Sequence, residues 1–150
     1  MKANKFNLKQ LENKWKQGLR ASVTVIGNEA KNFFVENFRK QGFDDKSVKH
    51  WQPRKTETDR KSRNKGARAI LVKSGDLRRS IKRHPANLSN LSIMISSDLP
   101  YAKIHNEGLE GKAWGKVPFK MPERRFIGDS YNLNEQMKKT VIRVIDKYLK

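Results

Sequence analysis

The sequence predicts an α+β fold with a long or kinked N-terminal helix, a small antiparallel β-sheet of about three to four strands, and a C-terminal helix packed on that sheet. Apolar residues recur at three- and four-residue steps up to residue 38, alternate with polar residues in short segments from residue 77, and return to helical spacing from residue 137. Helical spacing places apolar side chains on one stripe, whereas alternation places them on one face of a strand.

The N-terminal helix is predicted by the apolar stripe over residues 8–38. Asn7 is suited to the N-cap, and Gly42 lies where a C-terminal stop is expected. Gly18 and Gly27 weaken the middle, since each glycine costs about 1 kcal/mol relative to alanine in a helix interior. We therefore expect a kink or break near Gly27. The stripe consists of Leu8, Leu11, Trp15, Leu19, Val23, Ile26, Ala30, Phe33, Phe34 and Phe38, and core packing explains it better than a partner-binding face.

Helical spacing disappears from Asp44 to Arg68, where we expect a long mobile loop. Loops longer than about 15 residues in a compact domain are usually functional or disordered. Two interpretations remain open: an arm that orders on an assembly partner or along DNA, and a solvated, disordered insertion. The basic residues of this loop are Lys46, Lys49, Arg54, Lys55, Arg60, Lys61, Arg63, Lys65 and Arg68.

Three segments after this loop are predicted to be strands of an antiparallel meander. Residues 77–83 favour an edge strand, because arginines share a face with leucine and isoleucine. Residues 91–97 place Leu, Ile and Ile on one face. Residues 101–105 place Tyr101 and His105 on the same face of a third strand.

The last part of the chain is predicted to be irregular and then helical. Residues 107–121 contain glycines and a proline, which leaves room for one short hairpin around residues 116–120. A cap at Asn132 or Asn134 would begin a C-terminal helix that covers one face of the sheet. The apolar stripe of this helix consists of Met137, Val141, Val144, Ile145, Tyr148 and Leu149.

The charge of the chain is strongly positive: 34 Lys and Arg residues against 15 Asp and Glu residues give +19. The excess is spread along the sequence, so a detachable basic tail does not explain it. Such a charge attracts polyanions. Three interpretations remain open: a nucleic-acid binder, a subunit whose basic faces line a passage or meet acidic partners, and a lysine-rich solvated surface.

Composition also limits the class of protein. The chain contains no cysteine, which excludes disulfides and thiolate metal sites. No apolar run is long enough to span a membrane. We therefore expect one soluble, unexported domain over residues 1–150 whose stability rests on packing.

No catalytic, metal or cofactor site is predicted. The histidines are His50, His84 and His105, and no two of them have the i, i+4 spacing of a helical metal pair. His105 could act as a base oriented by Glu107 or Asp76, but no nucleophile is marked by a strained elbow motif. A histidine at a strand end, bonded to backbone or to a neighbouring subunit, is the preferred interpretation.

Four motifs occur in a fixed order from the first helical region to the closing helix. They are Trp51, the turn Ser74-Gly75-Asp76-Leu77, the segment Tyr101-Ala102-Lys103-Ile104-His105 with Gly108, and the loop Pro122-Glu123-Arg124-Arg125-Phe126-Ile127-Gly128. Together they resemble the phage virion morphogenesis family, the tail-completion proteins of contractile-tailed phages and prophages. The loop departs from the usual Pro-Ala-Arg-Pro-Phe pattern at Glu123 and Arg125, which loosens the turn.

The resemblance implies a noncatalytic structural protein that acts in tail completion and head-tail joining. Its partners would be phage tail and neck proteins, and its location the tail or neck of the virion after assembly in the bacterial host cytoplasm. A repeated head-to-tail contact would close a homo-oligomeric ring. No cofactor, membrane or small-molecule substrate is expected, and sequence-nonspecific nucleic-acid binding is the alternative. The residues assigned to fold corners or subunit contacts are Trp51, Gly75, Leu77, Tyr101, His105, Gly108, Arg124, Phe126 and Gly128.

Overall fold

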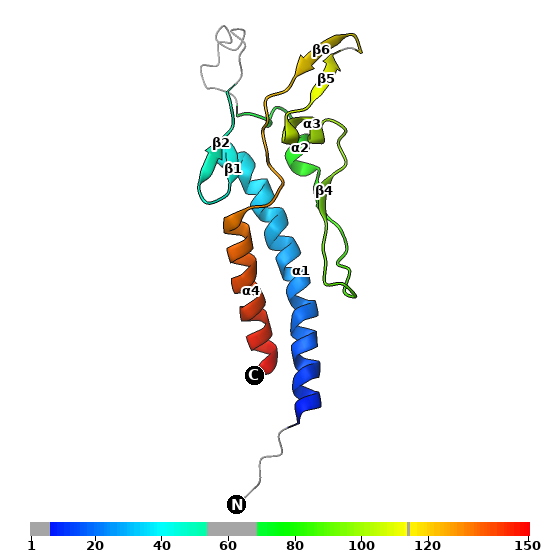
Figure 1. The fold of residues 1–150 in the computed structure, drawn as a ribbon, viewed down its shortest axis with the longest axis vertical. Coiled ribbons are helices and arrows are strands. Elements are labelled where there is room, and N and C mark those ends of the chain that lie inside the picture. The colour runs from blue at the N-terminus through cyan, green and yellow to red at the C-terminus, as the bar shows by residue number, and fades with distance from the viewer. Residues whose placement is uncertain (1–6, 54–68, 114) are drawn as a thin grey trace, which may run out of the picture.

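The computed structural model describes residues 7–53, 69–113 and 115–150 (Figure 1). Long helices at both ends of the chain enclose short helices and strands in the sequence between them, which confirms the predicted α+β class. The elements are, in order, α1 (Leu8–Lys40), β1 (Gly42–Asp44), β2 (Val48–His50), α2 (Asp76–Arg79), β3 (Ile81–Arg83), β4 (Ile95–Ser97), α3 (Ala102–Glu107), β5 (Glu110–Ala113), β6 (Val117–Lys120) and α4 (Tyr131–Leu149).

Helix α1 is one continuous helix of 33 residues, so the break expected near Gly27 is wrong. Asn7 is the N-cap, as predicted, and its side chain accepts a hydrogen bond from the Gln10 N–H. Close packing explains why residue 27 is glycine: a Cβ at this position would lie 2.0 Å from Cδ1 of Ile93. The helix ends at Gln41, whose φ of 51° is left-handed, one residue before the predicted stop at Gly42.

Helix α4 packs against α1 and not on a sheet, which corrects the predicted partner of this helix. The two helices lie side by side with opposite chain directions (Figure 1). The approach is close at Gly18, where a Cβ would lie 3.1 Å from Cα of Ile145. The N-cap of α4 is Ser130, which accepts a hydrogen bond from the Leu133 N–H, and not the asparagines proposed from the sequence.

In the part of the chain that the structure describes, the strands form three separate two-stranded antiparallel sheets, β1–β2, β3–β4 and β5–β6, and not one sheet of three or four strands. The segment 77–83 is helical over Asp76–Arg79 before it becomes strand β3. The predicted strand 101–105 is helix α3. A five-residue segment with matching residues four apart fits a helix as well as a strand, so its spacing could not decide.

The two other sheets are hairpins. Strands β5 and β6 form the short hairpin expected around residues 116–120. Strands β1 and β2 form a hairpin over residues 42–50, where the sequence suggested that a long loop begins at residue 44. The predicted loop residues 54–68 lie outside the described residues.

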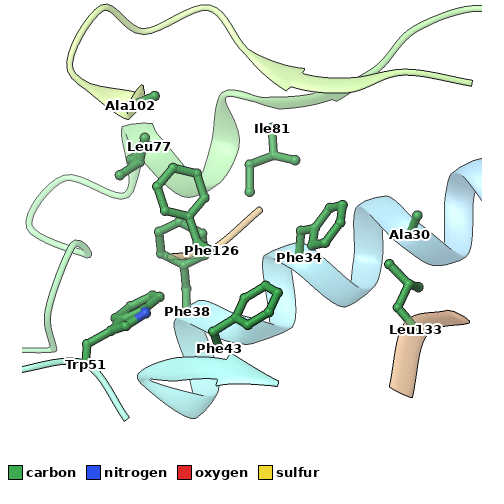
Figure 2. Packing of buried hydrophobic residues seen from close by; sticks show 10 residues of the cluster. All are labelled: Ala30, Phe34, Phe38, Phe43, Trp51, Leu77, Ile81, Ala102, Phe126 and Leu133. Carbon is green, nitrogen blue, oxygen red and sulfur yellow. The ribbon is translucent and has the colours of Figure 1, made fainter. Parts of the chain in front are cut away.

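The hydrophobic core lies at the upper end of α1 in Figure 1 and is dominated by aromatic rings. The Phe38 ring packs against Trp51 and Phe126, with centroids 5.5 and 5.2 Å away (Figure 2). The buried cluster consists of Ala30, Phe34, Phe38, Phe43, Trp51, Leu77, Ile81, Ala102, Phe126 and Leu133. The predicted apolar stripe of α1 is therefore core only in its later part, since Leu8, Leu11 and Trp15 are exposed.

Candidate functional site

One surface pocket of about 300 Å³ brings together Gly75, Leu77, Tyr101, His105 and Arg124 of the sequence-predicted contact residues. We call it the Tyr101 pocket. Its walls come from the segment before α2, the start of α2, helix α3 and the segment after β6. The residues that line it are Ile70, Leu71, Lys73, Ser74, Gly75, Asp76, Leu77, Tyr101, His105 and Arg124.

The turn at Gly75 forms one wall. Gly75 has a φ of 77°, a left-handed conformation that glycine adopts without a Cβ penalty. Arg79 closes the turn, since its Nη2 donates to Ser74 O over 2.8 Å and to Asp76 Oδ1 over 2.6 Å. The Ser74 hydroxyl and the Arg79 guanidinium bond the Asp76 carboxylate and lower its pKa. This side of the pocket is thus a short, hydrogen-bonded corner, and Leu77 anchors it in the core.

Helix α3 forms the opposite wall through Tyr101 and His105. Their rings meet edge to face, with centroids 6.1 Å apart. Tyr101 remains 40% exposed, whereas Nδ1 of His105 is buried and has no hydrogen-bond partner among the described residues. Burial lowers the pKa of His105, and the positive charge of Arg124 lowers it further. His105 is therefore a neutral ring that supports Tyr101, not a charged group offered to solvent.

Arg124 is buried, with 6% of its surface exposed. Its Nε and Nη2 donate to the carbonyl oxygen of Gln52 over 3.3 and 3.1 Å, and its backbone N–H donates to His105 O over 2.8 Å. These bonds join the segment after β6 to α3 and to the segment after β2. Arg124 therefore links two walls of the pocket, α3 and the segment after β6, to each other.

The remaining predicted residues lie in the core or at backbone corners. Trp51 Nε1 donates to Arg125 O over 2.7 Å, and Phe126 is buried against Phe38. Gly108 ends α3 with a φ of 66°, and a Cβ there would lie 2.8 Å from the backbone nitrogen of Glu123. A Cβ on Gly128 would lie 2.2 Å from Nε of Arg125. None of these four positions lines the pocket.

The arrangement offers little for acid-base chemistry. Asp76, which the sequence suggested as a partner of His105, is bonded to Ser74 and Arg79. The cation beside His105 opposes protonation of the ring, whereas a carboxylate would favour it. Within residues 7–53, 69–113 and 115–150, no three histidine or carboxylate side chains are grouped to hold a metal ion.

A model of the phage virion morphogenesis family matches residues 2–150. The chain belongs to the phage virion morphogenesis family. It is a structural or assembly protein of a phage particle, which confirms the resemblance and the general role drawn from the four motifs. No curated protein and no solved structure matches the chain. Among the described helices of this virion morphogenesis protein, none is both long and apolar enough to cross a membrane.

Two asparagines that the sequence analysis did not select hold the family's Phe126 loop. Asn106 Oδ1 accepts the N–H groups of Phe126 and Ile127 over 2.9 and 3.0 Å. Asn37 is fully buried, donates to Phe126 O over 3.1 Å and accepts from the Asp44 N–H over 3.2 Å. Asn37 could have been selected from the sequence, because it is a polar residue inside the aromatic part of the α1 stripe. Asn106 directly follows His105, at the end of the motif Tyr101-Ala102-Lys103-Ile104-His105.

Only Lys46 and Lys49 of the predicted basic loop lie in the described residues. Nζ of Lys46 lies 5.4 Å from the ring centroid of Tyr131, and Nζ of Lys49 lies 3.5 Å from Asp45 Oδ2. Both cations contact their own chain, at the junction of the β1–β2 turn and α4. The other basic residues of that loop, Arg54, Lys55, Arg60, Lys61, Arg63, Lys65 and Arg68, lie outside the described residues.

Proposed function

We propose that this protein acts without catalysis in tail completion and head-tail joining, and that the face around the Tyr101 pocket is its contact with a neighbouring subunit in the tail or neck. The observation that carries the proposal is the convergence of the motif residues. Gly75, Tyr101 and Arg124 come from three separate segments and line the same hollow. Family membership supports an assembly role in general.

The physical character of this face supports a protein contact. Tyrosine is enriched at the energetic centres of protein interfaces, because it offers a large rigid surface with a polar tip. Tyr101 stands exposed beside the partly buried apolar side chains of Ile70 and Leu71. The glycine corner and the buried Arg124 keep the walls in place, so a docking side chain would meet a preformed hollow. A head-to-tail contact of this kind closes a ring when its rotation divides a full turn.

Complementation of a phage that lacks this gene tests the proposal. Tyr101→Ala removes the exposed ring from the pocket, and we expect separate heads and tails, or tails with defective ends, in electron micrographs. Tyr131→Ala is the matched control, because Tyr131 is 51% exposed on α4, away from the pocket. It should give intact particles. Intact infectious particles with Tyr101→Ala, or without the protein, would contradict the proposal.

The net charge of +19 favours a second candidate, sequence-nonspecific nucleic-acid binding. Binding of free duplex DNA should then be measurable at physiological ionic strength, with affinity that falls steeply as salt is raised. Titration of labelled duplex at several salt concentrations distinguishes the candidates. Absence of binding at physiological salt removes nucleic-acid binding and leaves two interpretations of this charge: basic faces that line a passage or meet acidic partners, and a solvated lysine-rich surface.

A further inference from the structure

The first turns of α1 carry exposed apolar side chains on one face. Leu8, Leu11 and Trp15 are 71%, 37% and 46% exposed. Their separations of three and four residues place them on one stripe of the helix. We call residues 8–16 the α1 tip. A tryptophan and two leucines in one exposed row form the kind of apolar surface that a partner covers.

This stripe continues the face by which α1 packs against α4. Gly18 and Ser22, which lie seven residues beyond Leu11 and Trp15, are buried. Gly18 approaches the backbone of Ile145 on α4. In Figure 1 the C-terminal end of α4 stops short of the first turns of α1. Within the described residues, the helix-helix seam therefore extends beyond the end of α4 and lacks a covering helix along the α1 tip.

Basic side chains flank the stripe on both sides. Successive helical residues are about 100° apart, so Lys14 lies on one side of the stripe, and Lys9 and Lys16 lie on the other. Residues 8–20 contain four basic residues and one acidic residue, a net charge of +3. The acidic residue, Glu12, is paired with Lys16. An occupant of the stripe therefore meets a positively charged frame.

We infer that the α1 tip binds an amphipathic helix with acidic flanks that belongs to another virion protein. A helix fits because the bare stripe has the same spacing as the seam that α4 already fills. Acidic flanks fit because they pair with Lys9, Lys14 and Lys16. A second copy fits poorly, since two tips would bring two clusters of net charge +2 together. The inference goes beyond the proposed function, because the tip is separate from the Tyr101 pocket and its failure would leave that pocket's role intact.

Peptide binding to the full-length protein tests the inference directly. The probe is a fluorescein-labelled synthetic helix with leucines on one stripe and glutamates on both flanks, measured by anisotropy. We expect saturable binding that weakens as salt is raised. A peptide with lysines in place of the glutamates, and an acidic peptide of scrambled order, should each bind at least about tenfold more weakly. Equal binding of the scrambled peptide, or no binding of the probe, overturns the inference.

Variants locate the binding site on the molecule. Leu11→Glu and Trp15→Glu should each weaken binding of the acidic probe at least about tenfold. Ile142→Glu is the matched control, since it replaces a 61% exposed side chain on α4 with the same charge, and it should bind as the unmodified protein does. Leu11→Gln separates loss of apolar contact from added charge, and circular dichroism checks that each variant is folded. Unchanged binding by the folded Leu11 and Trp15 variants overturns the inference.

Cross-linking in assembled particles identifies the protein that binds the α1 tip. A photoreactive benzoylphenylalanine at position 11 should couple to a different virion protein, at a segment with an acidic amphipathic sequence. Coupling to a second copy of this chain, or to a segment without acidic residues, contradicts the inference.

Discussion

At the scale of single residues, Asn37 joins three parts of the fold from a fully buried position. Its amide donates to Phe126 O and accepts from the Asp44 N–H, so it connects α1 to the Phe126 loop and to the β1–β2 hairpin. A buried amide with partners on both sides specifies one arrangement of the aromatic core around it.

Replacing Asn37 with leucine should destabilise the protein by about 2–6 kcal/mol. The leucine has nearly the same length, but it leaves a buried carbonyl and a buried N–H without partners, and each such loss costs about 1–3 kcal/mol. Urea unfolding followed by circular dichroism measures the change in unfolding free energy. Asn32→Leu, at an exposed position of the same helix, should stay within about 0.5 kcal/mol. Equal effects of the two substitutions would show that the Asn37 hydrogen bonds are unimportant.

Residue types also explain which parts of the site could be predicted. Glycine, tyrosine and histidine at fixed spacing marked Gly75, Tyr101, His105 and Gly108 from sequence alone. The partners of these residues could not be predicted, because the hydrogen bonds of Arg124 to Gln52 and of Asn106 to Phe126 join segments that are far apart in the chain. Only the folded chain shows that Arg124 is buried and that Tyr101 stands at the rim.

At the scale of elements, α1 passes through Gly27 without interruption because the glycine is a point of close approach. The β3–β4 region lies against it, with Ile93 and Arg83 nearest to the absent side chain. Helix propensity alone suggested a break, but tertiary packing determined the outcome.

Gly27→Leu should therefore destabilise the protein by about 1–3 kcal/mol, because the added side chain overpacks the contact with Ile93. Asn28→Leu adds the same side chain at the next, exposed position and should stay within about 0.5 kcal/mol. Thermal and urea unfolding of both variants give the comparison. A Gly27→Leu protein as stable as the Asn28→Leu protein would mean that the close approach is not constraining.

The β1–β2 turn holds the beginning of α4 through two carboxylates. Asp44 accepts from the Asn132 amide over 2.7 Å, and Asp45 accepts from the Tyr131 N–H over 2.9 Å. Burial raises the pKa of Asp44, but hydrogen bonds from Lys40 and Asn132 outweigh burial and hold it below its ordinary value.

A lowered folded-state pKa makes the unfolding free energy depend on pH. The unfolded chain binds the proton more readily, so the stabilisation by Asp44 is complete above the unfolded pKa and is lost as pH falls through the lower folded value. We expect the unfolding free energy to decrease between about pH 5 and 3, and Asp44→Asn to flatten that slope. Lys40→Met removes a partner of the same carboxylate and should flatten the slope too. Urea unfolding across this range measures it, and parallel slopes in all three proteins would refute the assignment.

Whether a helix or strand was predicted correctly depended on the length of its segment. Periodicity over more than ten residues predicted correctly that α1 and α4 are helices, because a segment of that length distinguishes a helical stripe from alternation. The strand predicted over 77–83 is correct only at its end, residues 81–83, and the strand predicted over 101–105 is wrong. A few residues fit both the helical and the strand period. The partner of α4 could not be predicted at all, because an apolar stripe does not show which surface it covers.

At the scale of the whole molecule, an elongated pair of helices carries a compact aromatic core at one end (Figure 1). The Tyr101 pocket lies on the part built around α2 and α3, and the α1 tip lies at the far end of the long helix. Two separate surfaces on one chain suit a protein that joins different components of a particle. The charge of +19 creates a long-range field that attracts negatively charged molecules.

We propose above all that the face around the Tyr101 pocket is the surface on which other subunits dock. Electron microscopy of the purified protein, alone and mixed with isolated tail tubes, tests it most directly, with Tyr101→Ala and Tyr131→Ala in parallel. We predict rings of the protein at tube ends for the unmodified chain and for Tyr131→Ala, and bare tube ends for Tyr101→Ala. Bare tube ends with the unmodified protein, or decoration that Tyr101→Ala leaves unchanged, would contradict the claim.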